Sequence, residues 1–329
     1  MKPLERTATL LLRSRLGTYL LIFLGTMAVL IAAGVAKLPA VATGRGLVTG
    51  ASSPDFLTGP LSLFGALSMA AIIMFAMALI NKAYNLLRTS SQLFLGVFAI
   101  LQAANPIIST RICAGLLVAL TVLCAMGLMY SVYQRPVEGT KRIFFAFTLL
   151  SAGAMMQYAF VAYIPVFLAG CAQMRCFSFR TLLAAVVGMV VPWWIALGPG
   201  IISISDITFP TGLNVFTHLD IADKAQLIAV IIVSVIIGFA LTLTNMVKIY
   251  SYNARSRSFT GLLVTVTVAT LLLTMVDFAN VTAYLPLLNC CIAYQTALNF
   301  RINYENRGYI TVCTILAIYF IMFVWSILI

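Results

Sequence analysis

Long apolar runs separated by short polar segments cover almost the whole chain. A helix needs roughly 20 residues to cross an apolar layer about 30 Å thick. The pattern therefore predicts an all-α, polytopic transmembrane helix bundle of about 11 spans, several of them short or broken. The runs are Tyr19–Ala36, 60–80, 92–109, 112–130, 143–155, 157–172, 181–198, 225–247, 258–275, 284–300 and 308–329.

Two neighbouring runs, 143–155 and 157–172, are each too short to cross such a layer upright. If they form one long helix, the 20 Lys and Arg residues divide ten against ten across the membrane. If they are two helices that turn back near Gln157, 16 of the 20 lie on one side and five of the eight acids on the other. Membrane proteins keep Lys and Arg in cytoplasmic loops. We therefore expect the turn, with the N-terminus cytoplasmic and the C-terminus outside, in a bacterial inner (plasma) membrane.

The remaining organisation is simple. The first apolar run exceeds the 7–15 residues of a signal-peptide core, which favours an uncleaved first helix. All loops are short, so residues 1–329 are predicted to form a single integral membrane domain. Pro192, followed by two tryptophans, is read as a helix stop beside an interfacial aromatic belt.

Composition excludes several classes of protein. The chain is 62% hydrophobic and 9% charged, which leaves too little polar surface for a soluble domain of this length. The net charge of +12 would suit nucleic acid, but no basic patch or RNP-like motif accompanies it, so no nucleic-acid partner is expected. Membrane lipids are the expected partners, and a membrane-protein partner in a larger complex stays open.

Motifs for known cofactors are absent from the sequence. There is no P-loop, GxSxG or HExxH, and a single histidine cannot support haem or di-iron chemistry. No cofactor and no metal are predicted. The seven cysteines are read as small packing residues. Polar residues inside the spans are expected to form hydrogen bonds between helices; they are Gln102, Asn105, Gln157, Asn245, Asn289 and Gln295.

Acidic residues on the outer side are the candidates for chemistry. Asp55 lies in the first outer loop, where a carboxylate could act as a general base or hold a metal that carries a phosphate, or could simply occupy an exposed Ser-Pro turn. Asp277 lies at the outer end of the ninth run, and an ionisable group near the apolar zone suggests function. Its alternative is an ordinary interfacial aspartate in a turn. Both are kept as catalytic candidates.

Two further positions carry possible binding chemistry. His218, Asp220 and Asp223 precede the eighth run and could hold a cation or relay a proton, or could only cap the helix. Arg111 is one of the few basic residues on the outer side, and could bind a lipid phosphate or extend to the interface.

The stretch from Asn105 to Trp194 carries a resemblance. In order it contains Asn105-Pro106, Tyr133-Gln134-Arg135, Ser151-Ala152-Gly153, Tyr163-Ile164-Pro165, the basic pair Arg175 and Arg180, Gly188 and Pro192. It resembles an uncharacterised family of multi-pass inner-membrane proteins from Bacteroidota, some of which are labelled carotene monooxygenases. That activity requires four iron-binding histidines, whereas this chain has only His218.

More loosely, the same stretch is similar to the membrane half of polyprenyl-phosphate glycosyltransferases of the GT-C type. That resemblance implies a catalytic acid in the first outer loop, which maps to Asp55 alone. It also implies a role in handling envelope glycan or a lipid-linked sugar, with a polyprenyl-phosphate-linked glycan as partner. The alternatives are a carrier or lipid flippase with a site near Gln157, and a non-catalytic subunit of a membrane complex.

Overall fold

The computed structural model describes residues 9–35, 46–48, 60–87, 92–135, 139–208, 215–249, 252–303 and 308–328, and in these ranges the fold is helical. The helices are α2 (Arg15–Val35), α3 (Pro60–Tyr84), α4 (Leu93–Ala103), α5 (Pro106–Ser109), α6 (Ala114–Tyr130), α7 (Thr140–Met156), α8 (Ala159–Gln173), α9 (Phe179–Leu197), α10 (Ile221–Ile249), α11 (Ala254–Val276), α12 (Val281–Ile302) and α13 (Gly308–Leu328). Short 3-10 helices η2 (Ile204–Asp206), η3 (Val215–His218) and η4 (Phe278–Asn280) occur in the connections.

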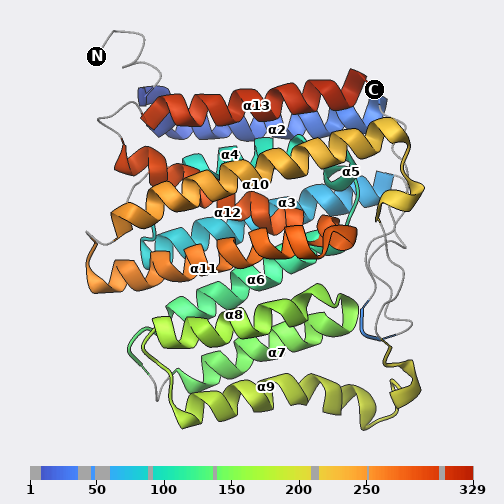
Figure 1. Cartoon of the computed structure of the whole chain (residues 1–329), viewed down its shortest axis with the longest axis vertical. Coiled ribbons are helices and arrows are strands. Elements are labelled where there is room, and N and C mark those ends of the chain that lie inside the picture. Colours follow the sequence, from blue (N-terminus) through green and yellow to red (C-terminus); the bar gives the residue numbers. More distant parts are fainter. Residues whose placement is uncertain are drawn as a thin grey trace.

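The long helices lie side by side and alternate in direction, so the connections gather at two opposite ends (Figure 1). One end, called here the basic end, contains the first turns of α7, α9 and α11 and the last turns of α3, α10 and α12. The other, the acidic end, carries all four described acids: Asp206, Asp220, Asp223 and Asp277. Twelve described basic residues belong to the basic end: Arg13, Arg15, Lys82, Arg135, Lys141, Arg142, Arg175, Arg180, Lys248, Arg255, Arg257 and Arg301.

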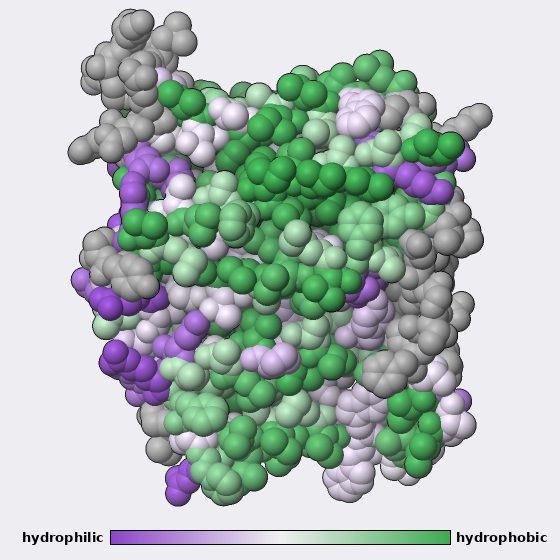
Figure 2. Space-filling view, viewed as in Figure 1, coloured by the Kyte–Doolittle hydropathy of each residue, from purple (hydrophilic) through white to green (hydrophobic). Residues whose placement is uncertain are grey.

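The outer surface of the bundle is apolar. Seven described helices are long and apolar enough to cross a membrane: α2, α3, α9, α10, α11, the η4–α12 unit and α13. Figure 2 shows apolar residues spread over the middle of this face, with hydrophilic residues towards its two edges. Large apolar side chains such as Phe75, Trp194 and Phe239 are more than half exposed. A surface of this kind requires lipid rather than water as its solvent, and the protein is a helical membrane protein.

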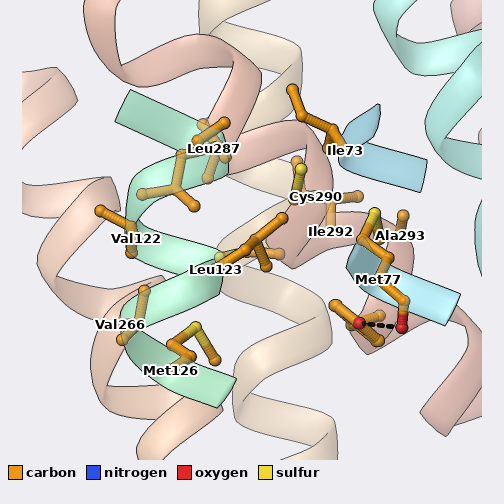
Figure 3. Packing of buried hydrophobic residues seen from close by; sticks show 14 of the residues in the cluster. Ile73, Met77, Val122, Leu123, Met126, Val266, Leu287, Cys290, Ile292 and Ala293 are labelled. Atoms are coloured by element: carbon orange, nitrogen blue, oxygen red, sulfur yellow. Dashed lines mark hydrogen bonds between the residues drawn. The ribbon is translucent and has the colours of Figure 1, made fainter. Parts of the chain in front are cut away.

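Helix α12 forms the centre of the bundle. Every residue in its most apolar window is buried, although it has the lowest hydropathy of the seven spanning candidates. It packs on α4, α6, α10, α11 and α13. Figure 3 shows Leu287, Cys290 and Ile292 of α12 among apolar residues of α3, α6 and α11. Lipid solvates apolar helices well. The helix with the most polar side chains therefore gains the most free energy when it is buried away from lipid.

Helices α7 and α8 form a hairpin. Met156 ends α7, Ala159 begins α8, and the two helices pack against each other and lie side by side in Figure 1. Gln157 has an extended backbone (φ −150°, ψ 118°), which interrupts the helix. A Cβ on Gly153 would lie 2.8 Å from the Phe160 ring, so the absence of a side chain there allows the tight reversal.

The expected span 92–109 is not one helix. The structure divides it into the 11-residue α4 and the four-residue α5, with Asn105 extended between them (φ −123°, ψ 90°). Pro106 explains the break, because proline disfavours a helical conformation in the preceding residue and cannot donate to a carbonyl.

The expectation that Pro192 stops a helix is wrong. Pro192 lies inside α9, which continues to Leu197. Proline deprives the carbonyl four residues earlier of its donor, but neighbouring helices can satisfy freed backbone groups in a membrane. Here the Ser151 hydroxyl of α7 donates to the Met189 carbonyl at 2.6 Å, and the Trp193 indole N–H donates to Ser151 at 3.1 Å. The carbonyl that Pro192 leaves without its helical donor is that of Gly188, so these bonds do not replace the lost one. They join α7 to α9 within one turn of the proline.

Candidate functional site

The acidic end carries a convergent set of hydrogen bonds around Asp277. The Tyr158 hydroxyl donates to Asp277 Oδ2 at 2.6 Å, and the Tyr284 hydroxyl donates to the same oxygen at 2.9 Å. Tyr158 and Asp277 are half-buried, whereas Tyr284 is buried. A carboxylate that accepts two phenolic hydrogen bonds is fixed in orientation.

A second layer of side chains holds these tyrosines. Gln157 Nε2 donates to Asn280 Oδ1 at 3.2 Å, and a further side-chain hydrogen bond joins Asn280 to Tyr158. Gln157 and Asn280 are both 1% exposed. We call Gln157, Tyr158, Asp277, Asn280 and Tyr284 the Asp277 cluster. Its bonds run from the α7–α8 break to the α11–α12 connection, so two interruptions of the helical bundle meet at one point.

Local sequence explains why the cluster forms at this place. The last helical bond of α11 runs from the Asp277 N–H to the Leu273 carbonyl at 2.9 Å, so the aspartate lies where the helix ends. Gln157 and Tyr158 lie in the two-residue connection of the hairpin. Helix α8 packs against α11, where the Tyr163 hydroxyl bonds Thr270 at 3.1 Å. That contact brings the hairpin turn onto the end of α11.

The charge of Asp277 is not balanced by the residues around it. Among the described residues, the carboxylate is bonded only by the two tyrosine hydroxyls, and it makes no ion pair. The C-terminus of α11 carries partial negative charge, and the N-terminus of α12, which begins at Val281, carries partial positive charge. These two helix ends oppose each other, so neither end replaces a counter-charge for Asp277.

The other predicted site residues do not join this cluster. Asp55 lies outside the described residues. Arg111 lies between α5 and α6 at the acidic end, half-buried. A Cβ on Gly115 would lie 2.3 Å from the Thr282 carbonyl oxygen, so the start of α6 touches the first turn of α12. Arg111 is therefore on the same end, in the connection just before an adjoining helix, and it makes no ion pair to Asp277.

The His218, Asp220 and Asp223 group has the layout of a helix start. Asp223 is in the first turn of α10, and the Asp220 carbonyl accepts the Lys224 N–H at 2.9 Å, the first bond of the helix. His218 ends η3, and its side chain is outside the described part. Among described side chains, no group of three His, Cys, Asp or Glu could hold a metal.

A second acidic feature has a local explanation. The Ser203 hydroxyl donates to Asp206 Oδ2 at 2.7 Å and the Ser203 N–H donates to the same oxygen at 2.9 Å. These two bonds lower the pKa of Asp206 below its ordinary value. Asp206 is half-buried and caps its own 3-10 helix, which is an ordinary structural role for an aspartate.

The interhelical hydrogen bonds expected from the polar residues in the spans are confirmed for five of the six. Asn289 donates to Gln102 at 3.2 Å and Asn245 donates to Gln295 at 2.6 Å, while Gln157 bonds Asn280. The exception is Asn105, whose side-chain nitrogen and oxygen are buried without a partner. From the sequence we did not single out Tyr158, Tyr284 or Asn280. Their only signal was closeness in sequence to Gln157 and Asp277.

Comparisons with known proteins give no relative. No family model, no curated protein and no solved structure matches the chain. The resemblances drawn from the residue pattern stay predictions.

Proposed function

We propose that the protein is an inner-membrane protein of about eleven spans that handles a lipid-linked envelope glycan, and that its acidic end binds the ligand's polar head group. The observation that carries this proposal is the Asp277 cluster. It is a fixed, half-buried carboxylate at an end of an apolar bundle, where a head group would lie while its chain stays in lipid. A carboxylate of this kind accepts hydrogen bonds from hydroxyl or amino groups.

The roles proposed for the remaining residues follow from charge. Asp277 repels a phosphate, so a phosphate of the same ligand would lie towards Arg111, the basic residue just before the adjoining helix α6. Asp55 is proposed as a second acid from the first outer loop. The N-terminus and the basic end are proposed to lie in the cytoplasm, because the positive-inside rule favours that orientation.

The orientation is tested by labelling single cysteines with an impermeant maleimide in intact cells, in a variant without native cysteines. We expect Lys141→Cys and Arg180→Cys, at the starts of α7 and α9, to be protected, and Asp220→Cys to react. Reaction at only one of the first two positions would mean that the α7–α8 hairpin does not return to its starting side. The span count and the site position would then be wrong.

The function is tested by complementation of a deletion strain, with envelope glycan as the readout. Asp277→Asn keeps the shape of the side chain and removes its charge, and we expect it to abolish complementation. Asp206→Asn is the matched control, because Asp206 is an acid at the same end whose carboxylate accepts hydrogen bonds from Ser203 of its own loop. Full complementation by Asp277→Asn would reject a role for this carboxylate.

A second candidate function is a carrier with its site at the α7–α8 break. The observation in its favour is the buried bond between Gln157 and Asn280, which links the hairpin turn to the α11–α12 connection. Broken helices often line the substrate sites of transporters. Uptake into proteoliposomes that is lost in Gln157→Leu, with glycan complementation retained by Asp277→Asn, would favour the carrier.

A further inference from the structure

We propose that the ligand group bound by the Asp277 cluster is an organic ammonium, such as the amino group of a lipid head group or of an amino sugar. This rests on the proposed function, because it names the chemistry that the same site recognises. The argument uses the charge of the site, the direction of its hydrogen bonds and the aromatic residues beside it.

The charge of the site requires a cation. Asp277 is half-buried and has no ion pair with a described residue, and the adjoining helix ends oppose each other. Lys224 and Arg111 are the described basic residues of the acidic end, and neither pairs with this carboxylate. A partly desolvated carboxylate without a counter-charge binds a cation more strongly than a neutral hydroxyl, and it disfavours phosphate.

The hydrogen bonds around Asp277 leave its Oδ1 as an acceptor for a ligand that carries only hydrogen-bond donors. Both tyrosine hydroxyls donate to Oδ2, and no described residue donates to Oδ1. An ammonium group carries only donors, whereas a phosphate carries acceptors that have nothing to bond here.

An aromatic pair adjoins the carboxylate. Phe278 follows Asp277 directly in the chain and stacks on Phe216 of η3, with ring centroids 4.8 Å apart and planes inclined by 11°. Phe278 is 37% exposed, so part of its ring is available to a ligand. Aromatic faces attract alkylammonium groups through their quadrupole, and a carboxylate next to such rings is a common form of ammonium site.

The test measures binding to the purified protein by thermal unfolding, at constant ionic strength. The probes are ethanolamine as the ammonium, glycerol as a neutral polyol and sodium as a simple ion. We expect ethanolamine to raise the Tm of the wild type in a saturable manner, and glycerol and sodium to have no saturable effect. Nanodiscs of phosphatidylethanolamine or phosphatidylglycerol then distinguish a lipid amine from a free one. Only if the ligand is a lipid amine would the protein retain phosphatidylethanolamine more tightly than phosphatidylglycerol.

Two variants locate the effect. Asp277→Asn keeps an oxygen for the tyrosine hydroxyls, and we expect it to weaken ethanolamine binding about tenfold or more, since bonds to charged groups are worth that much. Phe278→Ala is expected to weaken binding about threefold, through the lost ring face. Asp206→Asn should bind ethanolamine like the wild type. Size-exclusion profiles and the Tm without ligand show whether each variant is folded.

The outcomes separate this inference from the proposed function. Equal stabilisation by sodium, or binding of glycerol alone, overturns the ammonium assignment. Ethanolamine binding that survives Asp277→Asn in a folded protein places the site elsewhere and also overturns it. If Asp277→Asn abolishes glycan complementation but ethanolamine never binds, the proposed function stands and the ammonium assignment fails. If Asp277→Asn complements fully and ethanolamine does not bind, both fail.

Discussion

The contact between α10 and the central helix offers the sharpest test of how this bundle is stabilised. Asn245 of α10 is fully buried, and its Nδ2 donates both to Gln295 Oε1 at 2.6 Å and to the Gln295 carbonyl at 3.0 Å. Asn299 Nδ2 also approaches Asn245 Oδ1 at 3.5 Å. Asn245→Leu removes these bonds and keeps a similar side-chain volume, so the loss of hydrogen bonding is measured with little cavity formation.

The expected magnitude follows from the number of bonds. Interhelical hydrogen bonds in membranes average about 0.6 kcal/mol each and reach about 1.7 kcal/mol. Loss of the two Asn245 donor bonds therefore costs about 1–3 kcal/mol of unfolding free energy, since Gln295 Oε1 is also left buried without a donor. Met246→Ala is the control: Met246 is the next residue and is 41% exposed, so we expect a change below about 0.5 kcal/mol.

The assay is reversible unfolding in mixed detergent micelles, for the two single variants Asn245→Leu and Gln295→Leu and for the double variant. Gln295 Nε2 already lacks a partner, so replacing both side chains removes buried polar groups that would otherwise stay unsatisfied. We expect the double variant to be more stable than the sum of the single effects by about 1 kcal/mol or more. Additive losses, or an Asn245→Leu no less stable than Met246→Ala, would refute the proposed coupling.

Two further predictions use other helix contacts. Gly115→Ala places a Cβ 2.3 Å from the Thr282 carbonyl oxygen and should lower the unfolding free energy by about 1–3 kcal/mol, whereas Gly34→Ala, with no atom within 4 Å of the new Cβ, should not. The same micelle assay compares them, and equal stabilities would mean that α6 and α12 are not in close contact. Ser151→Ala removes the acceptor of the Trp193 indole N–H and should shift the tryptophan emission maximum and lower Tm; an unchanged spectrum and Tm would contradict the α7–α9 bond.

Part of the fold could be read from the sequence because lipid imposes a simple rule on length and charge. Each of the eleven expected runs contains a helix, since an apolar segment long enough for a bilayer has few alternatives to a helix. Twelve of the fourteen described basic residues lie at one end. The same rule predicted the turn near Gln157. Boundaries were less certain: Asn105 and Pro106 interrupt a run whose composition alone looks continuous.

Only part of the candidate site could be predicted from the sequence. Asp277 and Gln157 stood out because polar groups are rare in apolar surroundings. Tyr158 and Tyr284 did not, because tyrosines are ordinary at membrane interfaces. The bond from Tyr158 to Asp277 joins residues 119 positions apart, and no periodicity predicts such a contact.

The sequence by itself determined the class of protein, the positions of the helices and the end at which its charges gather, because apolar length and charge act locally along the chain. Only the tertiary structure decided which helix is central, since helices in lipid are apolar on every side and show no buried face in their pattern. It also decided that Pro192 stays helical, in a stretch of α9 that packs on α7 and accepts a hydrogen bond from Ser151 at the Met189 carbonyl. The Asp277 cluster belongs to the same category, for it exists only where the hairpin turn meets the end of α11.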